Sequence, residues 1–390
     1  MANKNILPTQ SRTVQVETNY LSPVSIIPSQ PNSPIGTMYC FLSKVDQWTD
    51  DNNPPSPTQD QKYIKEVFKN IFFMKKVTTF DMSPVIERID WQTGTVYDYY
   101  RDDVNMFELD YNGTILRKFY IKNSYDQVFK CLWNNNGGES TVEPTFEPGT
   151  FNANQIFQGA DDYKWKYMYT INSGSKIKFM DDIWMPVDME KNIPNPLLKY
   201  AGAGSIDVIN VIDGGSGYSE ANSPIIVEIT GDGQHASANV VLSAGVITDI
   251  TVANTGSNYT YANVTISSSL GSGATANAYT SPIGGHGFDY VSELGASRVM
   301  LTAEFNSDEG GLIPTDMTYY QIGLVINPTT VESGLQAQQN DTSPYPASGP
   351  IYSTTTDLVI APGFGEYISD EIVWQGDTYG LATFSGTVVS

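Results

Sequence analysis

The stretch Ile206–Thr280 contains two copies of one pattern. The first copy reads IDVINVIDGGSGYSEANSPIIVEITGDGQHASANVVLSAG, and the second reads ITDITVANTGSNYTYANVTISSSLGSGATANAYT. Gly-Ser-Gly-Tyr at Gly215–Tyr218 returns as Gly-Ser-Asn-Tyr at Gly256–Tyr259, with the two tyrosines 41 residues apart. Alternating apolar positions between Gly and Asn turns are typical of β-hairpins. Two copies are too few for an open solenoid, so we predict a compact all-β module over 204–281.

The composition of the whole chain favours β-structure as well. The 390 residues include 33 Gly and 22 Pro, which supply many turns, and 24 Tyr with 16 Phe, which suit strands. Frequent turn formers with aromatic residues favour short strands and long loops over helix bundles. We therefore predict a mainly β protein, with antiparallel sheets or sandwich-like domains, long loops and one clear amphipathic helix.

Charge is distributed unevenly along the chain. The formal net charge is −22, and 20 of the 21 Lys and Arg residues lie between Lys4 and Lys199. Residues 200–390 hold 19 acidic residues and a single basic one, Arg298, and the repeat at 206–280 has no Lys or Arg. Nucleic acids and anionic membranes require clustered basic side chains, so neither is an expected partner. The acidity favours solubility before assembly, and attraction of a basic partner is the alternative.

The two cysteines and the apolar runs indicate where the protein is made. Cys40 and Cys131 each lie in an apolar run, so we expect buried free thiols, with a disulfide between them left open. No apolar run reaches the roughly 20 residues that span a bilayer, and Met1–Pro8 lacks the apolar core of a signal peptide. These features predict a protein made in the cytosol. The apolar end at Thr387–Val389 leaves open a continuation of the native chain.

Shifts in composition divide the chain into five predicted parts. These are an extended arm at 1–36, a core at 37–203, the repeat at 204–281 hung on a loop of that core, a second core segment at 282–335, and a β extension at 336–390. Alternating or apolar runs predict the strands of the core. The expected strands are Thr37–Val45, Val85–Trp91, Gln127–Trp133, Tyr163–Ile171, Phe179–Val187, Arg298–Phe305 and Tyr319–Asn327.

One helix is predicted over about 58–76. Thr58 and Gln61 have the spacing of a capping box, and Lys75 and Lys76 suit a helix C-terminus. One helical face is apolar, through Tyr63, Ile64, Val67, Phe68, Ile71 and Phe72.

Two other segments carry specific local expectations. A Tyr-Asn-Gly turn at Tyr111–Gly113 predicts a hairpin between Phe107–Asp110 and Phe119–Lys122. Tyr163–Ile171 alternates, with aromatic residues on one face and Lys164 and Lys166 on the other, so it predicts a half-exposed strand.

Residues able to carry chemistry form no convincing set. His235 and His286, the two histidines, both lie in Gly-rich turns and are predicted to be surface residues, since no ligand spacing links them. Gly214–Tyr218 resembles a phosphate loop but lacks its Lys-Ser/Thr and following helix. Paired carboxylates could serve a glycosidase, yet no partner pattern selects one of the pairs Asp102–Asp103, Asp161–Asp162, Asp181–Asp182, Asp308–Glu309 and Asp370–Glu371. The sequence predicts no catalytic, cofactor-binding or metal-binding residue.

Outside the repeat, an ordered set of short motifs resembles a known family. The motifs are Asp-Gln-Trp at Asp46–Trp48, a Pro-rich loop, the predicted helix, VIERIDW at Val85–Trp91, VFKCLW, DDYKWKYMYTI, IWMPV and YYQIGLVINPTT. In this order they resemble the baseplate wedge subunit called protein 8 in T-even-like contractile-tailed bacteriophages. The resemblance covers roughly residues 37–200 and 298–330. The repeat, the arm and the tail after Pro328 depart from it.

The resemblance implies a structural role. It implies a virion protein of the tail baseplate, assembled in the host cytoplasm, that binds other wedge subunits and forms a homodimer within each wedge. It implies no enzymatic activity, no cofactor and no small-molecule ligand. The aromatic residues at Tyr97–Tyr100 and Tyr163–Tyr169 are expected to be exposed and to suit the core of a protein interface. The alternatives are a carbohydrate-binding tail adhesin or tail-associated glycan hydrolase, in which the Gly-rich repeat and its tyrosines stack on sugars, and a soluble enzyme of unknown type.

Overall fold

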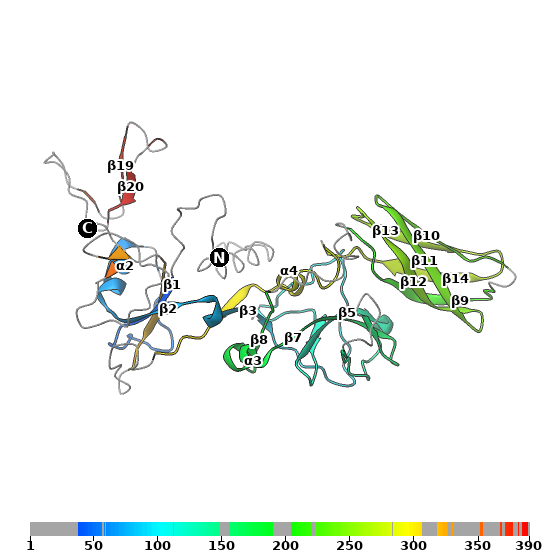
Figure 1. The fold of residues 1–390 in the computed structure, drawn as a ribbon, viewed down its shortest axis with the longest axis horizontal. Helices are drawn as coiled ribbons and strands as arrows, with labels where there is room; N and C mark the ends of the chain where they lie inside the picture. Colours follow the sequence, from blue (N-terminus) through cyan, green and yellow to red (C-terminus); the bar gives the residue numbers. More distant parts are fainter. Residues whose placement is uncertain are drawn as a thin grey trace. The chain divides into compact units, whose positions relative to one another are not determined.

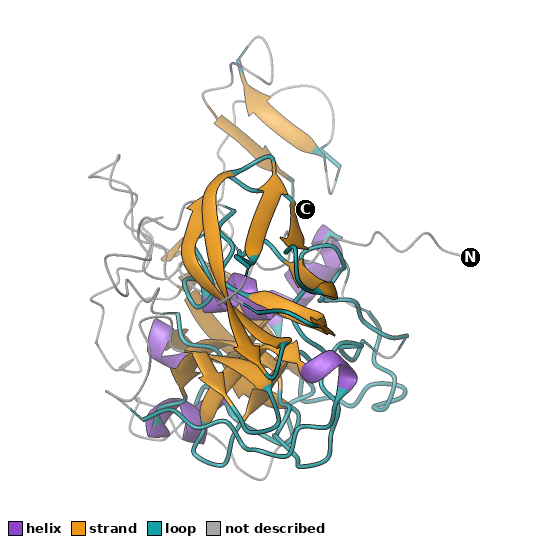
Figure 2. Ribbon diagram, turned by 90° about the vertical axis from the view of Figure 1, so that its right-hand side faces the viewer, coloured by secondary structure: helices purple, strands orange, loops and turns teal. Residues whose placement is uncertain are grey.

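The structure, a computed structural model, describes most of the chain between residues 38 and 326. The described ranges are 38–56, 58, 60–111, 113–147, 156–189, 204–219, 223–282, 284–305, 318–326, 329–330, 352–353, 367–368, 371–376, 381 and 384–388. The predicted arm at 1–36 lies outside them. Strands dominate the described part (Figure 2), so the predicted mainly β fold is confirmed. The chain divides into two compact units, one holding Ser83–Met300 and the other the described residues before and after it.

The second unit is built on a three-stranded antiparallel sheet. Its central strand β1 (Met38–Ser43) pairs with β16 (Gln321–Ile326) on one side and β2 (Ile71–Val77) on the other. Five of the six β1 residues are buried, so this strand is covered on both faces. Two further short pairs belong to this unit: β17 (Thr329–Thr330) with β18 (Tyr352–Ser353), and β19 (Ile372–Gln375) with β20 (Phe384–Thr387).

The predicted helix is real but shorter than expected. Helix α2 spans Gln61–Lys69, and its N-cap is Asp60, whose Oδ1 accepts from the Lys62 N–H at 2.9 Å. The prediction of a capping box at Thr58 and of a helix reaching Lys76 was therefore wrong. The run IFFMKKV continues the helical spacing at its start but also alternates like a strand. Pairing with β1 along its length satisfies the backbone groups of this run, so the run forms strand β2 instead of extending the helix.

The first unit contains two sheets before the repeat. One has the order β4-β5-β7-β6 and is antiparallel throughout; its strands are β4 (Tyr120–Lys122), β5 (Gln127–Asn134), β7 (Tyr163–Thr170) and β6 (Ile156–Gln158). The other has the order β15-β3-β8, with β15 (Arg298–Leu301), β3 (Met82–Glu87) and β8 (Trp184–Pro186). Short helices complete the unit: α3 (Ser173–Phe179), α4 (Tyr290–Leu294) and the 3-10 turn η2 (Asn135–Gly137). The 3-10 turn η1 (Thr79–Asp81) belongs to the second unit.

The core of this unit is aromatic. Trp165 stacks on Tyr163 with 5.5 Å between ring centroids and meets Tyr97 edge to face at the same distance. Both faces of β7 are covered, and even Lys164 and Lys166 are buried. The expectation of a half-exposed strand, and of exposed aromatic residues at Tyr97–Tyr100 and Tyr163–Tyr169, was therefore wrong. The missing cover comes from residues 286–294 and the repeat, which are distant in the sequence.

The Tyr-Asn-Gly turn forms a smaller hairpin than predicted. Leu109 bridges to Ile115, and the Asp110 N–H donates to the Thr114 carbonyl at 2.9 Å. Phe119–Lys122 does not pair with Phe107–Asp110, because β4 pairs with β5 instead. A locally encoded turn sets the hairpin tip, whereas burial of Tyr120 and Ile121 in the core selects the partner of β4.

The repeat folds into six strands, β9 to β14 (Figure 1), whose order has an internal symmetry. The first copy gives β9 (Ile209–Ser216), β10 (Ile226–Gly231) and β11 (Gln234–Ser243), and the second gives β12 (Val246–Ser257), β13 (Ala262–Ser267) and β14 (Ser272–Ala278). One sheet has the order β11-β12-β9-β14, and β10 pairs with β13 in the other. Exchanging the two copies maps each sheet onto itself. The copies therefore complete each other's sheets, and Ile209 pairs with its counterpart Ile250 where they meet.

The two anchor tyrosines occupy equivalent buried positions in this module. The Tyr218 N–H donates to the Gly245 carbonyl and the Tyr259 N–H to the Gly204 carbonyl, both at 3.0 Å. Gly215 and Gly256 precede them with φ of 60° and 65°, which glycine adopts without strain. A Cβ at either glycine would also approach backbone atoms to 2.7 Å or less, so both the turn geometry and the close packing require glycine.

Because both tyrosines fill the module core, we expect Tyr218→Ala and Tyr259→Ala to destabilise it similarly. Removing a buried aromatic ring costs about 3–5 kcal/mol, which urea unfolding of the full chain followed by circular dichroism would measure. Tyr261→Ala, at an exposed position of the second copy, is the matched control and should change the free energy by less than about 0.5 kcal/mol. A large cost at only one of the two buried tyrosines would show that the copies are not structurally equivalent.

Candidate functional site

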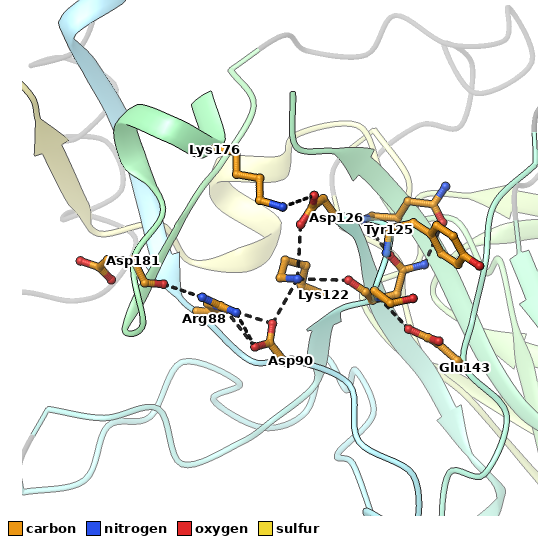
Figure 3. Close-up of polar contacts among 11 residues, drawn as sticks. Arg88, Asp90, Lys122, Tyr125, Asp126, Glu143, Lys176 and Asp181 are labelled. Carbon is orange, nitrogen blue, oxygen red and sulfur yellow. Dashed lines mark hydrogen bonds and ion pairs between the residues drawn. The ribbon is translucent and has the colours of Figure 1, made fainter. Parts of the chain in front are cut away.

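A network of alternating charges lies where β3, β4 and α3 meet (Figure 3). Arg88 pairs with Asp90 at 2.8 Å, and Lys122 bridges Asp90 and Asp126 at 3.3 and 3.4 Å. Lys176 on α3 reaches Asp126 at 2.7 Å. The backbone reinforces the arrangement, because the Arg88 N–H donates to the Ile183 carbonyl at 2.7 Å. The network therefore ties segments near residues 88, 122 and 180 into one rigid surface.

The β4–β5 turn in this network is fixed by Asn123. Its Oδ1 accepts from the N–H groups of Tyr125 and Gln127 at 2.9 and 2.8 Å, and its Nδ2 donates to the Pro144 carbonyl at 2.8 Å. Glu143 accepts from the Ser124 N–H at 2.6 Å. All these bonds anchor the turn backbone, and the side chain of Tyr125 at its tip is left 66% exposed.

The network carboxylates are held in their charged form. Burial alone would raise the pKa of Asp90, but the hydrogen bond from Arg88 and the charge of Lys122 outweigh it and lower the pKa. Burial alone would also raise the pKa of Asp126, but the hydrogen bond from Lys176 and the charges of Lys122 and Lys176 outweigh it and lower the pKa. Lowered carboxylate pKa values mean that the network stabilises the fold at neutral pH and loses this contribution in acid.

Three apolar side chains flank this network along the chain. Tyr125 adjoins Asp126, Ile177 adjoins Lys176, and Ile183 provides the carbonyl that Arg88 binds. Ile177 is 85% and Ile183 60% exposed. Apolar anchors beside fixed, partly desolvated charges are typical of the surfaces through which proteins bind one another. We call Tyr125, Ile177, Ile183 and the ion pairs between them the α3 surface.

A second polar cluster is buried beneath the repeat. Lys130 of β5 pairs with Glu293 of α4 at 2.9 Å, with side-chain exposures of 0% and 1%. The Lys130 ammonium lies 4.2 Å from the centre of the Tyr100 ring, and that ring meets His286 edge to face at 4.8 Å. The charges of Glu293 and Lys130 act on Lys166 and shift its pKa in opposite directions. These residues come from four distant segments, and we call them the buried junction.

Burial dominates the protonation of the junction. It lowers the pKa of Lys130 against the opposing effect of Glu293, and it lowers the pKa of Lys166 to about 8. The pKa of His286 falls well below its usual value through burial and the nearby Lys130 and Lys166 charges. His286 is therefore neutral at physiological pH, and its Nδ1 is buried without a hydrogen-bond partner. The prediction of a surface histidine was wrong for His286, because the repeat and β5 enclose its turn, whereas His235 is exposed.

The repeat is fixed to the rest of its unit by polar contacts. Asn210 donates to the Leu132 carbonyl at 3.0 Å, Lys164 pairs with Asp249 at 2.7 Å, and Asp102 accepts from the N–H and hydroxyl of Thr280. The repeat has its own apolar core of buried Ile, Tyr and Ala residues. It is thus a module docked along β5 and β7, rather than one attached to a loop only through its chain ends.

The carboxylate pairs of the sequence have structural roles where they are described. Asp103 pairs with Arg101 at 2.7 Å, and Asp161 accepts from the N–H groups of Thr141 and Val142. Asp181 accepts from the N–H groups of Ile183 and Trp184. Asp308–Glu309 and Asp370 lie outside the described residues. The carboxylates that matter most for the geometry, Glu293 and Asp126, are not members of a sequence pair.

Other features of the described residues add no ligand site. A small cavity of about 40 Å³, beside Glu87, Tyr120 and Arg298, has room for about one water molecule and is far below the size of a ligand pocket. Among the residues the structure describes, no three His, Cys, Asp or Glu side chains gather as metal ligands, and no helix is long and apolar enough to cross a membrane. Cys40 and Cys131 are buried free thiols, as predicted.

The residues of both clusters were not selected from the sequence. Lys130 lies within the apolar run VFKCLW, and Lys166 alternates with aromatic residues, so each could have been predicted as a buried lysine that needs a carboxylate. Arg88 and Asp90 stand two residues apart on a strand pattern, where side chains share one face. Glu293, the partner of Lys130, and Lys122, the partner of Asp90, are distant in the chain, and no local spacing identifies them.

The pH dependence of stability tests the environment of Lys166. Its pKa of about 8 in the folded protein lies below that of an unfolded chain, about 10.4, so the unfolded state binds more protons between these values and stability rises with pH. Between about pH 7 and pH 9 the free energy of unfolding should rise by roughly 1 kcal/mol more than in Lys166→Met, measured by urea unfolding. Lys178→Met, on the exposed side of α3, should keep the wild-type slope. An unchanged slope in Lys166→Met would contradict this environment.

The sequence was compared with protein families and with curated proteins. No family model matches this chain, and no curated protein matches it. The α3 surface and the buried junction are therefore assigned from their own geometry.

Proposed function

We propose that the chain is a structural subunit of the baseplate wedge of a contractile bacteriophage tail. In this role it binds neighbouring wedge subunits, forms a homodimer within the wedge and catalyses no reaction. The ordered motifs support the phage assignment, and the α3 surface supports a role in protein assembly. Its location would be the tail baseplate of the virion, after assembly in the host cytoplasm.

The observation that carries the proposal is the meeting of two motifs at the α3 surface. VIERIDW at Val85–Trp91 supplies Arg88 and Asp90, and the segment Phe179–Val187 supplies Ile183 and strand β8, which pairs with β3. Motifs that are about 90 residues apart in the sequence are thus held side by side by strand pairing and a backbone hydrogen bond. A patch that combines exposed aliphatic side chains with rigid ion pairs fits a permanent protein partner better than a small ligand.

The sugar-binding alternative loses its main support in the repeat. Tyr218 and Tyr259, the aromatic residues of the two anchors, are buried within the module and cannot stack on a glycan. Tyr261 is exposed and remains an aromatic ring that could do so. The copy number separates the two functions, because a wedge subunit follows the sixfold symmetry of the baseplate, whereas a peripheral adhesin is usually trimeric.

We expect quantitative mass spectrometry of purified phage particles to find two copies of this chain in each sixfold sector of the baseplate. The control is a tail protein of known stoichiometry measured in the same particles. Copy numbers in multiples of three, with removal of the chain by mild stripping of peripheral fibres, would favour the adhesin. Absence of the chain from the particles would reject both functions.

Substitutions in the α3 surface test its role directly. Ile177→Asp and Ile183→Asp should each reduce incorporation into tails at least tenfold, because a buried interface anchor contributes about 2 kcal/mol or more. Incorporation is measured by complementing phage that lack the native gene and quantifying the chain in purified tails. Tyr111→Asp is the matched control, since Tyr111 is 96% exposed at the tip of a different turn. Normal incorporation of both isoleucine variants would remove the α3 surface from the interface.

A further inference from the structure

We propose that Lys130 and Glu293 of the buried junction join covalently through a side-chain isopeptide bond that the folded protein forms by itself. The pair would be a site of self-modification that links strand β5 to helix α4. The two residues are 163 positions apart, so the bond would close a loop that contains β6 to β14. This inference is independent of the proposed tail function.

The geometry brings the two reacting groups together without water. The Nζ of Lys130 lies 2.9 Å from Oε2 of Glu293, and the two side chains are 0% and 1% exposed. The face of the Tyr100 ring, 4.2 Å from Nζ, covers the amine. Holding an amine and a carboxyl group in contact in a fixed orientation replaces a collision between separate molecules and lowers the barrier to their reaction.

The backbone around Glu293 is arranged to stabilise the charge of an intermediate. Oε1 accepts from the N–H groups of Gly287, Phe288 and Asp289 at 2.8, 2.9 and 3.2 Å. When the amine attacks Cδ, negative charge develops on this oxygen, and three convergent N–H donors act there as an oxyanion hole. Gly287 has a φ of 86°, which lets the turn aim these donors at one atom.

His286 can move the protons that the reaction must transfer. Its Nδ1 is buried, has no hydrogen-bond partner, and lies 3.9 Å from Oε2 of Glu293. The charges of Lys130 and Lys166, together with burial, keep the imidazole neutral and able to accept a proton. Nζ donates directly to Oε2, the atom that leaves, so one proton can pass between these two atoms, and the neutral imidazole beside Oε2 is placed to hold a proton in transit.

The reaction balances without any co-reactant. The Nζ–Cδ bond forms and the Cδ–Oε2 bond breaks, while two protons of the ammonium leave with Oε2 as one water molecule. No atom changes oxidation state. The products are neutral, whereas the reactants are two charges in an apolar interior whose desolvation is costly.

The pair Lys164–Asp249 provides an internal comparison. Its Nζ–Oδ1 distance is 2.7 Å, shorter than that of the buried pair, but its side chains are 11% and 27% exposed. Water can solvate both charges there and can reverse a condensation. We therefore expect one bond in the protein, at Lys130 and Glu293, and an ordinary ion pair at Lys164 and Asp249.

The intact mass of the full chain tests whether the Lys130–Glu293 isopeptide bond forms. We expect the purified, denatured protein to be lighter than its sequence mass by one water molecule, about 18 Da. After tryptic digestion, the link should join the peptide 123–164, uncut after Lys130, to the peptide 200–298 that contains Glu293. A mass equal to the full sequence mass, with free cleavage after Lys130, overturns the proposal even if no variant is made.

Variants identify the reacting groups. Lys130→Arg should keep the full mass, and Lys164→Arg, the matched control, should still lose one water molecule. His286→Phe should lose water more slowly after synthesis, as followed by intact mass over time. An unchanged rate in His286→Phe would overturn the role of the imidazole. Loss of water in Lys130→Arg would overturn the assignment of the amine.

Discussion

A charged amine in an apolar interior is stable only if a carboxylate, and donors for that carboxylate, are placed around it. Lys130 imposes this requirement on the first unit, because it projects from the middle of β5 into a fully buried site. Glu293 meets the requirement, and Glu293 is itself held by the N–H groups of its own turn. The position of residues 286–294 is thereby fixed against the β5–β7 sheet.

The docking of the repeat follows from the same arrangement. Residues 281–297 connect the last strand of the repeat to β15, so fixing α4 also fixes the chain that leaves the module. Asn210, Asp249 and Thr280 then make their contacts along β5, β7 and the Tyr97–Tyr100 loop. The second face of β7 is closed by this docking. The burial of its aromatic residues and lysines is a consequence of tertiary placement rather than of the strand pattern.

The contrast between local sequence patterns and contacts made by distant segments explains which features could be predicted from the sequence. The repeat, its turns and most core strands were recognised because alternation and Gly-Tyr anchors act over a few residues. The end of α2 was misplaced because Ile71 and Phe72 satisfy helical and strand spacing alike, and only pairing with β1 distinguishes them. The exposure of β7, the burial of His286 and the partner of Lys130, which is 163 positions away, depend on distant segments that no local pattern encodes.

The internal symmetry of the repeat has a consequence for its folding. The sheet order β11-β12-β9-β14 ends in β11 on one side and in its counterpart β14 on the other. Each edge therefore belongs to a different copy of the repeat, although β11 has 10 residues and β14 has 7. A duplication within one chain has thus produced a module in which neither copy has a complete sheet of its own, so the two copies can form their sheets only together.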